Sequence, residues 1–279
     1  MSNNTAETGG GGDSLEKVLL EASDIGLSFG GLQALKNVKV GIRSDEILGL
    51  IGPNGAGKTV FLNCLCGIHR PQLGQLYFEG QEVTGFPPHQ LARMGIGRSF
   101  QQIELFPHMT VIENTLVGRH VKMKNGIFSS GLYWGPGRKE EATAREKAEE
   151  IIDFLELYPY RKMKVGSLSY GVQKLVGLSR ALAMEPKILL LDELGSGLNH
   201  EEKEDLARFL LRILHVKHIP VVWVEHDLKM VGEIADRLVC FYYGCKIADG
   251  PPQEVMKDPK VVEAYTGPQE GGKRFLRFR

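Results

Sequence analysis

The segment Ile47–Thr59 reads ILGLIGPNGAGKT, and it is the strongest indication of the fold class of this chain. Its first five residues are apolar, which predicts a buried strand, and an apolar helical pattern begins directly after the glycine-rich stretch. Gly52, Gly55 and Gly57 let the backbone fold so that several N–H groups face one anion. A helix N-terminus adds partial positive charge at the same place. The sequence therefore predicts a loop that cradles phosphate groups.

This loop predicts the binding of ATP and Mg²⁺. Lys58 is expected to reach the β- and γ-phosphates, and the Thr59 hydroxyl is expected to bind the metal ion. An ordinary glycine-rich turn is the alternative, but the full eight-residue pattern between a strand and a helix argues against it. The other loop residues expected to contact the nucleotide are Gly52, Pro53, Asn54, Gly55, Ala56, Gly57 and Val60.

A second motif, ILLLDE at Ile188–Glu193, predicts a buried strand that ends in two acids. Asp192 is expected to hold Mg²⁺ directly or through water, and Glu193 to polarise the attacking water as a general base. An apolar run ending in two carboxylates is common by itself. The motif is more specific in this chain because a phosphate loop precedes it.

The rest of the chain predicts an α/β fold with additions. Short strands such as Leu27–Phe29 and Val38–Ile42 alternate with turns before the loop and favour an antiparallel β subdomain. Residues 102–180 contain a charged helical stretch and are predicted to form an inserted α-helical subdomain. Strand and helix then alternate again, with Asn199 and Glu202 forming a capping box, which favours a mostly parallel sheet.

The chain is predicted to consist of three segments. Residues 1–16 are polar and glycine-rich and are predicted to be a disordered tail, residues 17–267 to be the folded ATP-binding domain, and residues 268–279 to be a basic tail. The formal net charge is zero, so no nucleic-acid partner is expected. No apolar run approaches the roughly 18 residues that a membrane span needs. The spacings of the four cysteines match no common zinc pattern, which favours reduced thiols.

The stretch LSYGV at Leu168–Val172 resembles the signature of the ATP-binding cassette (ABC) family, which is usually LSGGQ. Val172 stands where glutamine is usual. The resemblance implies that Ser169, Tyr170 and Gly171 bind the γ-phosphate end of a nucleotide held by the opposite subunit, at the N-terminus of the helix that they open. The resemblance thus makes a dimer of cassettes part of the mechanism.

Three single residues gain a role only from this resemblance. Gln101 matches a glutamine that senses Mg²⁺ and the catalytic water, His226 a histidine that contacts the γ-phosphate, and Phe29 an aromatic residue that stacks on adenine. Each has a plainer alternative: a surface glutamine, a structural histidine and a core phenylalanine. The chain departs from the family pattern at Leu194, where proline is usual, and at Asn199, where aspartate is usual.

Further stretches narrow the resemblance to one branch. FGGLQAL at 29–35, residues 95–120 and DPKVVEAYTG at 258–267 resemble the ATP-binding subunits of branched-chain amino-acid importers, in particular the longer of the two paralogues, with its insertion near 122–140. The resemblance implies two multi-span permeases, a sister ATP-binding subunit and a periplasmic or extracellular solute-binding protein. It also implies a peripheral location on the cytoplasmic face of the cell membrane.

Other functions stay open at this point. Related subunits serve importers of urea, short amides or aromatic acids, and a similar one serves lipopolysaccharide export. Soluble cassette ATPases that act on ribosomes or DNA usually carry two cassettes or a long insertion in one chain, and neither is visible here. A small-molecule kinase would lack the LSYGV signature and the histidine. Because the ATPase does not touch the cargo, the sequence does not identify it.

Overall fold

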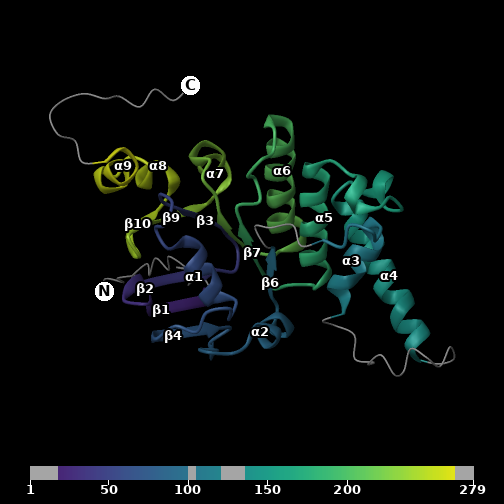
Figure 1. Cartoon of the computed structure of the whole chain (residues 1–279), viewed down its shortest axis with the longest axis horizontal. Coiled ribbons are helices and arrows are strands. Elements are labelled where there is room, and N and C mark those ends of the chain that lie inside the picture. The colour runs from purple at the N-terminus through teal and green to yellow at the C-terminus, as the bar shows by residue number, and fades with distance from the viewer. Residues whose placement is uncertain (1–17, 100–104, 121–135, 268–279) are drawn as a thin grey trace, which may run out of the picture.

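The computed structural model describes residues 18–99, 105–120 and 136–267 of the 279-residue chain. Figure 1 shows the arrangement of these parts. The two predicted tails lie outside the described residues, as do Gln101 and most of the insertion near 122–140.

A six-stranded sheet forms the centre of the molecule, in the order β10-β9-β3-β8-β7-β6. All neighbouring pairs are parallel except β9 and β10. Every residue of β3, β7 and β8 is buried, as expected for strands covered on both faces. The predicted mostly parallel sheet is confirmed. The strands are β3 (Ile47–Ile51), β6 (Ile96–Ser99), β7 (Ile188–Asp192), β8 (Val221–Val224), β9 (Arg237–Tyr242) and β10 (Cys245–Gly250).

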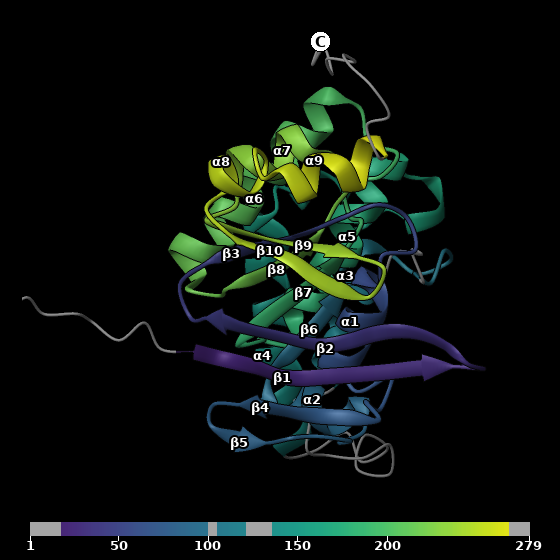
Figure 2. The same ribbon diagram turned by 90° about the vertical axis from the view of Figure 1, so that its left-hand side faces the viewer.

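A four-stranded antiparallel sheet, in the order β2-β1-β4-β5, lies beside the central sheet (Figure 2). The short strands predicted from the sequence are parts of two strands of 12 residues each. Irregular register between these two strands interrupts the alternation of buried and exposed residues, which hid their true length. The strands are β1 (Val18–Phe29), β2 (Leu32–Arg43), β4 (Leu73–Phe78) and β5 (Gln81–Glu82).

Helix α1 (Lys58–Leu65) fills the space between the two sheets. Its residues Phe61, Leu62 and Leu65 are fully buried, and the Phe61 ring lies 5.2 Å from the ring of Phe241 on β9. The helix therefore packs on one face, as the sequence predicted, and its N-terminus is fixed at the edge where β3 ends.

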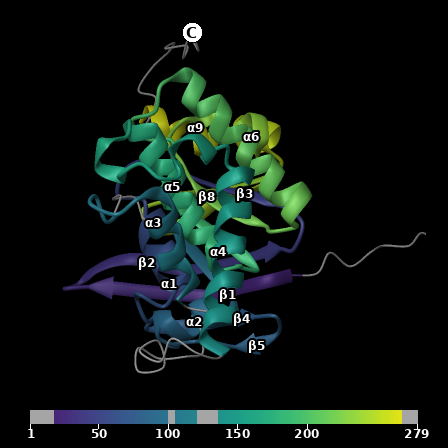
Figure 3. The same cartoon turned by 90° about the vertical axis from the view of Figure 1, so that its right-hand side faces the viewer.

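A group of helices lies on the far side of the central sheet (Figure 3). Helices α3 and α5 pack so closely that a Cβ on Gly118 would lie 2.2 Å from the Arg180 carbonyl oxygen. The hydroxyls of Thr115 and Ser179 join the two helices at 2.8 Å. These helices fall within or overlap the predicted range 102–180, whose boundaries stay a prediction. They are α3 (Val111–Arg119), α4 (Pro136–Phe154) and α5 (Tyr170–Ala183), with short 3₁₀ turns at Tyr158–Tyr160 and Val165–Ser167. Helix α2 (Pro88–Met94) comes before this range and leads into β6.

Helix α6 (His200–Lys217) begins with the predicted capping box. The Asn199 side chain accepts a hydrogen bond from the Glu202 N–H at 2.9 Å, and the Glu202 carboxylate accepts one from the Asn199 N–H at 3.0 Å. In the described ranges no helix is long and apolar enough to cross a membrane. The remaining helices are α7 (Leu228–Ile234), α8 (Pro252–Val255) and α9 (Pro259–Thr266).

Two substitutions on α6 test whether this helix is held by its buried face. Leu210 is fully buried and Val216 is 62% exposed on the same helix. We expect Leu210→Ala to lower the free energy of unfolding by about 2–5 kcal/mol because it leaves a cavity. Val216→Ala should change it by no more than about 0.5 kcal/mol. Urea unfolding of both variants measures the difference, and equal losses would contradict the packing described here.

Candidate active site

The loop between β3 and α1 is built around glycines that approach other parts of the backbone. Gly52 has φ +140° and Gly57 has φ +106°. A Cβ on Gly52 would lie 2.2 Å from the Phe241 carbonyl oxygen, and a Cβ on Gly57 would lie 2.8 Å from the Ala34 carbonyl oxygen. A side chain at either position would force the loop or its neighbours to shift. The loop is thus held in its curved shape by contacts with β9 and β2.

Lys58 lies across this loop. Its ammonium group donates hydrogen bonds to the carbonyl oxygens of Gly52 at 2.6 Å and Pro53 at 3.1 Å. Burial lowers the pKa of Lys58, and the negative charge of Glu193 acts in the opposite direction. The lysine is therefore held by the loop itself, at the place where the sequence predicts a phosphate group.

Asp192 meets Thr59 at the end of β7. The Thr59 hydroxyl donates to Asp192 Oδ1 at 3.2 Å, and an Arg98 nitrogen lies 3.2 Å from Asp192 Oδ2. Asp192 is only 1% exposed; burial raises its pKa, while the positive charge of Arg98 opposes this shift. A carboxylate beside a hydroxyl is the kind of oxygen pair that Mg²⁺ prefers. The structure therefore brings together two of the predicted metal ligands; the third, Gln101, lies outside the described residues.

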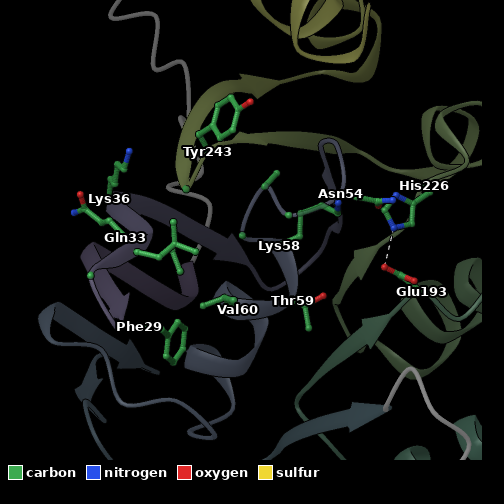
Figure 4. Close-up of a pocket in the computed structure, with 17 residues that line it drawn as sticks. Phe29, Gln33, Lys36, Asn54, Lys58, Thr59, Val60, Glu193, His226 and Tyr243 are labelled. Carbon is green, nitrogen blue, oxygen red and sulfur yellow. Dashed lines mark hydrogen bonds and ion pairs between the residues drawn. The ribbon is translucent and has the colours of Figure 1, made fainter. Parts of the chain in front are cut away.

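Glu193 and His226 form a pair beside the loop. His226 Nε2 lies 2.7 Å from Glu193 Oε1 (Figure 4). Glu193 has φ +50°, which is unusual for a residue with a side chain, and its N–H donates to the Val224 carbonyl oxygen at 2.9 Å. The Glu225 carboxylate accepts from the N–H groups of His226 and Gly195, both at 3.0 Å. The turns after β7 and β8 are thus fixed to each other.

A pocket of about 590 Å³ connects these groups. Figure 4 shows Lys58 and Thr59 between Phe29 on one side and the Glu193–His226 pair on the other. Phe29 is 46% exposed, and its ring makes an edge contact with His69 at 5.2 Å. The pocket is lined by Phe29, Gly31, Leu32, Gln33, Ala34, Lys36, Asn54, Gly55, Ala56, Gly57, Lys58, Thr59, Val60, Glu193, His226, Tyr243 and Gly244.

The residues of the LSYGV segment do not line this pocket. Ser169 caps α5, and its hydroxyl accepts from the Val172 N–H at 3.4 Å. A Cβ on Gly171 would lie 2.2 Å from a Glu202 carboxylate oxygen, so α5 and α6 meet at their N-termini. Tyr170 is 49% exposed. This segment therefore lies outside the pocket that the phosphate loop of the same chain lines.

Comparison with known proteins gives the family. A family model described as "ABC transporter" matches residues 35–195, which is more than half of the chain. The chain belongs to the ABC transporter family. A second family model, described as "Branched-chain amino acid ATP-binding cassette transporter", matches residues 245–267 at the end of the described cassette.

Curated relatives and solved cassettes agree with this assignment. The chain is 36% identical over 91% of its length to the high-affinity branched-chain amino acid transport ATP-binding protein BraF of Pseudomonas aeruginosa, and it covers 99% of that protein. It has the same identity and coverages with the corresponding protein LivG of Escherichia coli K12. The crystal structure of the ADP conformation of an ATP-binding cassette superposes with a TM-score of 0.79, at 34% identity over 90% of this chain and 100% of that one.

A dimeric cassette is also among the solved structures that this chain resembles. It is a post-hydrolysis state bound to ADP and Pi, with a TM-score of 0.71 and 25% identity over 84% of this chain and 99% of that chain.

Together, these comparisons confirm the α/β cassette fold, the ATPase class and the resemblance to the branched-chain subunits, including the longer paralogue.

The sequence did not predict some contacts around the pocket of this ABC ATPase. Lys174 is buried and donates to the Glu193 carbonyl oxygen at 3.2 Å. Its position one helical turn after Tyr170 was a usable signal, since residues four apart share a helix face. Arg98 lies in a short strand that the sequence analysis did not predict. Tyr265, whose hydroxyl accepts from the Gly52 N–H, gave no local signal because it lies 213 residues away.

The close approach of Gly57 to β2 yields a direct test. Gly57→Ala would place a methyl group against the Ala34 carbonyl oxygen, so the loop must shift and the affinity for ADP should fall at least about tenfold. Gly80 is a matched control, because it also has positive φ, +78°, but a Cβ there meets nothing within 4 Å. Gly80→Ala should keep the wild-type affinity in an equilibrium binding titration. Equal affinities of the two variants would contradict the steric account.

Proposed function

We propose that this ABC ATPase uses the pocket around Lys58 to bind and hydrolyse ATP, and that it powers the uptake of branched-chain amino acids. The observation that carries the proposal is the meeting of three groups at one edge of the central sheet: the phosphate loop, the Thr59–Asp192 contact and the Glu193–His226 pair. The names of the curated relatives and the match at residues 245–267 support the amino-acid cargo.

Thr59 and Asp192 would hold Mg²⁺ through their oxygens, with Gln101 as the further proposed contact. The buried carboxylate fits this role, since a bound cation would offset the cost of keeping its charge away from water. When bound, the metal ion neutralises charge on the phosphates. Lys58 would exchange the carbonyl oxygens of Gly52 and Pro53 for phosphate oxygens, and Phe29 would stack on the adenine at the other end of the pocket.

Glu193 is the proposed general base. Its carboxylate lines the pocket and would accept a proton from the attacking water at Oε1 or Oε2. His226 would orient that carboxylate and contact the γ-phosphate, and the Glu225 bonds to His226 and Gly195 would keep the turns in place. The positive φ of Glu193 is a strained conformation of the kind that gathers at active sites, and it agrees with this role.

A second cassette would complete each site. The N-terminus of α5, where Ser169 and Tyr170 are exposed and Gly171 is buried, would contact the nucleotide held by the partner cassette. The ADP-bound dimer of a related cassette supports such a pairing. The partner is proposed to be a sister ATP-binding subunit or a second copy of this chain. Closure of the pair would switch the population of transporter conformations, because these contacts exist only in the closed state.

The proposed assembly places the cassettes on the cytoplasmic face of the cell membrane, bound to two multi-span permeases. A periplasmic or extracellular solute-binding protein would deliver the amino acid.

Deletion of this chain's gene from its native cell should abolish high-affinity uptake of labelled leucine, isoleucine and valine, and expression of the intact chain should restore it. Loss of urea, amide or aromatic-acid uptake instead would assign the cassette to one of those systems.

Replacement of the proposed base separates binding from chemistry. Glu193→Gln keeps the shape of the side chain but removes its basicity, so the ATP hydrolysis rate should fall by about 10²–10⁴-fold. Binding of ATP with Mg²⁺ should persist and, under the proposed pairing, accumulate closed dimers in size-exclusion chromatography. A variant that hydrolyses ATP at the wild-type rate would remove Glu193 from this role.

The proposed action of the signature on a partner makes a different prediction. Ser169→Arg adds bulk and charge at the exposed N-terminus of α5, away from the chain's own pocket. Hydrolysis should be lost, whereas a single chain should bind nucleotide with unchanged affinity. Ser167→Arg, two residues earlier and also exposed, provides a control of equal charge. If Ser169→Arg also lost binding to the single chain, the action across subunits would be contradicted.

A further inference from the structure

A hydrogen bond joins helix α9 to the first residue of the phosphate loop. The Gly52 N–H donates a hydrogen bond of 2.6 Å to the hydroxyl oxygen of Tyr265, which lies near the C-terminal end of α9. Figures 1 and 2 show α8 and α9 beside β9 and β10, at the end of the cassette that lies opposite α4. A segment more than two hundred residues from the loop thus takes part in shaping it.

Residues 243–267, the C-terminal segment that follows β9, touch the loop at a second place. In the turn between β9 and β10, the Gly244 N–H donates to the Ala56 carbonyl oxygen at 2.9 Å, and the Gly244 oxygen accepts from the Lys36 N–H at 2.8 Å. The approach is close, because a Cβ on Gly244 would lie 2.6 Å from the Ala34 oxygen. The phosphate loop is therefore held at two places, Gly52 and Ala56, by residues that follow β9.

The peptide groups on either side of Gly52 have different partners. Its carbonyl oxygen accepts from Lys58, and its N–H donates to Tyr265. Under the proposed function, Lys58 leaves this carbonyl when it turns to a phosphate. The bond to Tyr265 does not involve Lys58 and can persist through that change. It is thus suited to keep Gly52 at φ +140° while the lysine is engaged elsewhere.

The tyrosine is itself well fixed. Val261, one helical turn before Tyr265, is 3% exposed, and the Asp258 side chain caps α9 by accepting from the Lys260 N–H at 2.8 Å. A tyrosine hydroxyl is ordinarily neutral at physiological pH, and burial raises the pKa of Tyr265 further. A neutral, anchored hydroxyl oxygen is a constant acceptor for the Gly52 N–H.

We propose that Tyr265 is a positioning residue through which the C-terminal segment sets the nucleotide affinity of the phosphate loop. By accepting the Gly52 N–H, Tyr265 keeps the empty loop in the conformation that binds phosphate. Without the hydroxyl, the loop spends part of its time in conformations that do not bind phosphate. The apparent affinity is then the intrinsic affinity multiplied by the fraction of molecules whose loop is in the binding conformation. The proposal rests on the proposed function of this pocket and gives residues 245–267 a task within it.

Tyr265→Phe in the full chain is the test, since it removes one oxygen atom and keeps the packed ring. We expect the dissociation constant for ADP with Mg²⁺ and the KM for ATP to rise roughly tenfold, and kcat to stay within about twofold, because the bond acts on the loop rather than on Glu193. Tyr77→Phe is the matched control. It removes an exposed hydroxyl on β4 that bonds Gln75 at 2.9 Å, and its affinity should equal that of the wild type.

Thermal unfolding of the three proteins separates positioning from stability. A purely structural role would lower the midpoint of Tyr265→Phe and leave its dissociation constant for ADP unchanged, and this result would overturn the proposal. A fall in kcat with an unchanged KM would overturn it as well. If the wild-type chain itself bound no ADP, the proposed function of the pocket would fail first, so the two failures can be told apart.

Discussion

The close approach of Gly52 and Gly57 to neighbouring carbonyl oxygens is the constraint on which the rest of the site depends. A loop that presents N–H groups to phosphates must curve tightly, and a tight curve brings its Cα atoms against whatever lies behind them. Here the backbone of β9 and β2 lies behind them, so the position of the loop is set by both sheets at once. The antiparallel sheet is thus part of the framework that holds the proposed phosphate site.

The order of the central strands explains why the chemistry gathers at one edge. β8 lies between β3 and β7, and all three run in parallel, so their carboxyl ends meet. The phosphate loop follows β3, Asp192 and Glu193 lie at the end of β7, and His226 follows β8. Segments far apart in the sequence therefore need no long side chains to reach each other. Ligand sites at this edge are the rule for sheets of this kind.

The sequence predicted the parts of the fold and site that depend on local patterns. The strand at Ile47–Ile51, the cap at Asn199 and the phosphate loop each follow from residues within a few positions of one another, and the structure has all three. The meeting of Thr59 with Asp192 could also be predicted, because carboxyl ends of parallel strands lie together. The roles of Gln101, Phe29 and the LSYGV segment rest on family resemblance and stay proposals.

The features that escaped prediction depend on tertiary packing. The length of β1 was hidden because irregular pairing with β2 disturbs the alternation of apolar residues. The contacts of Arg98 and Tyr265 join distant segments of the chain, and no local sequence pattern around either residue predicts its partner. The contacts of Lys174 are partly predictable from the sequence. Helix periodicity places Lys174 near Tyr170, but it does not predict the hydrogen bond to the Glu193 carbonyl oxygen.

The proteins that bind this chain in its native membrane show whether the cassette takes part in transport. The measurement is isolation of the tagged chain from gently solubilised native membranes in the presence of ATP and Mg²⁺, followed by mass spectrometry of the proteins that remain bound. The account predicts two multi-span permeases together with a second ATP-binding subunit. Recovery of ribosomes, DNA-repair proteins or the chain alone would contradict a role in transport.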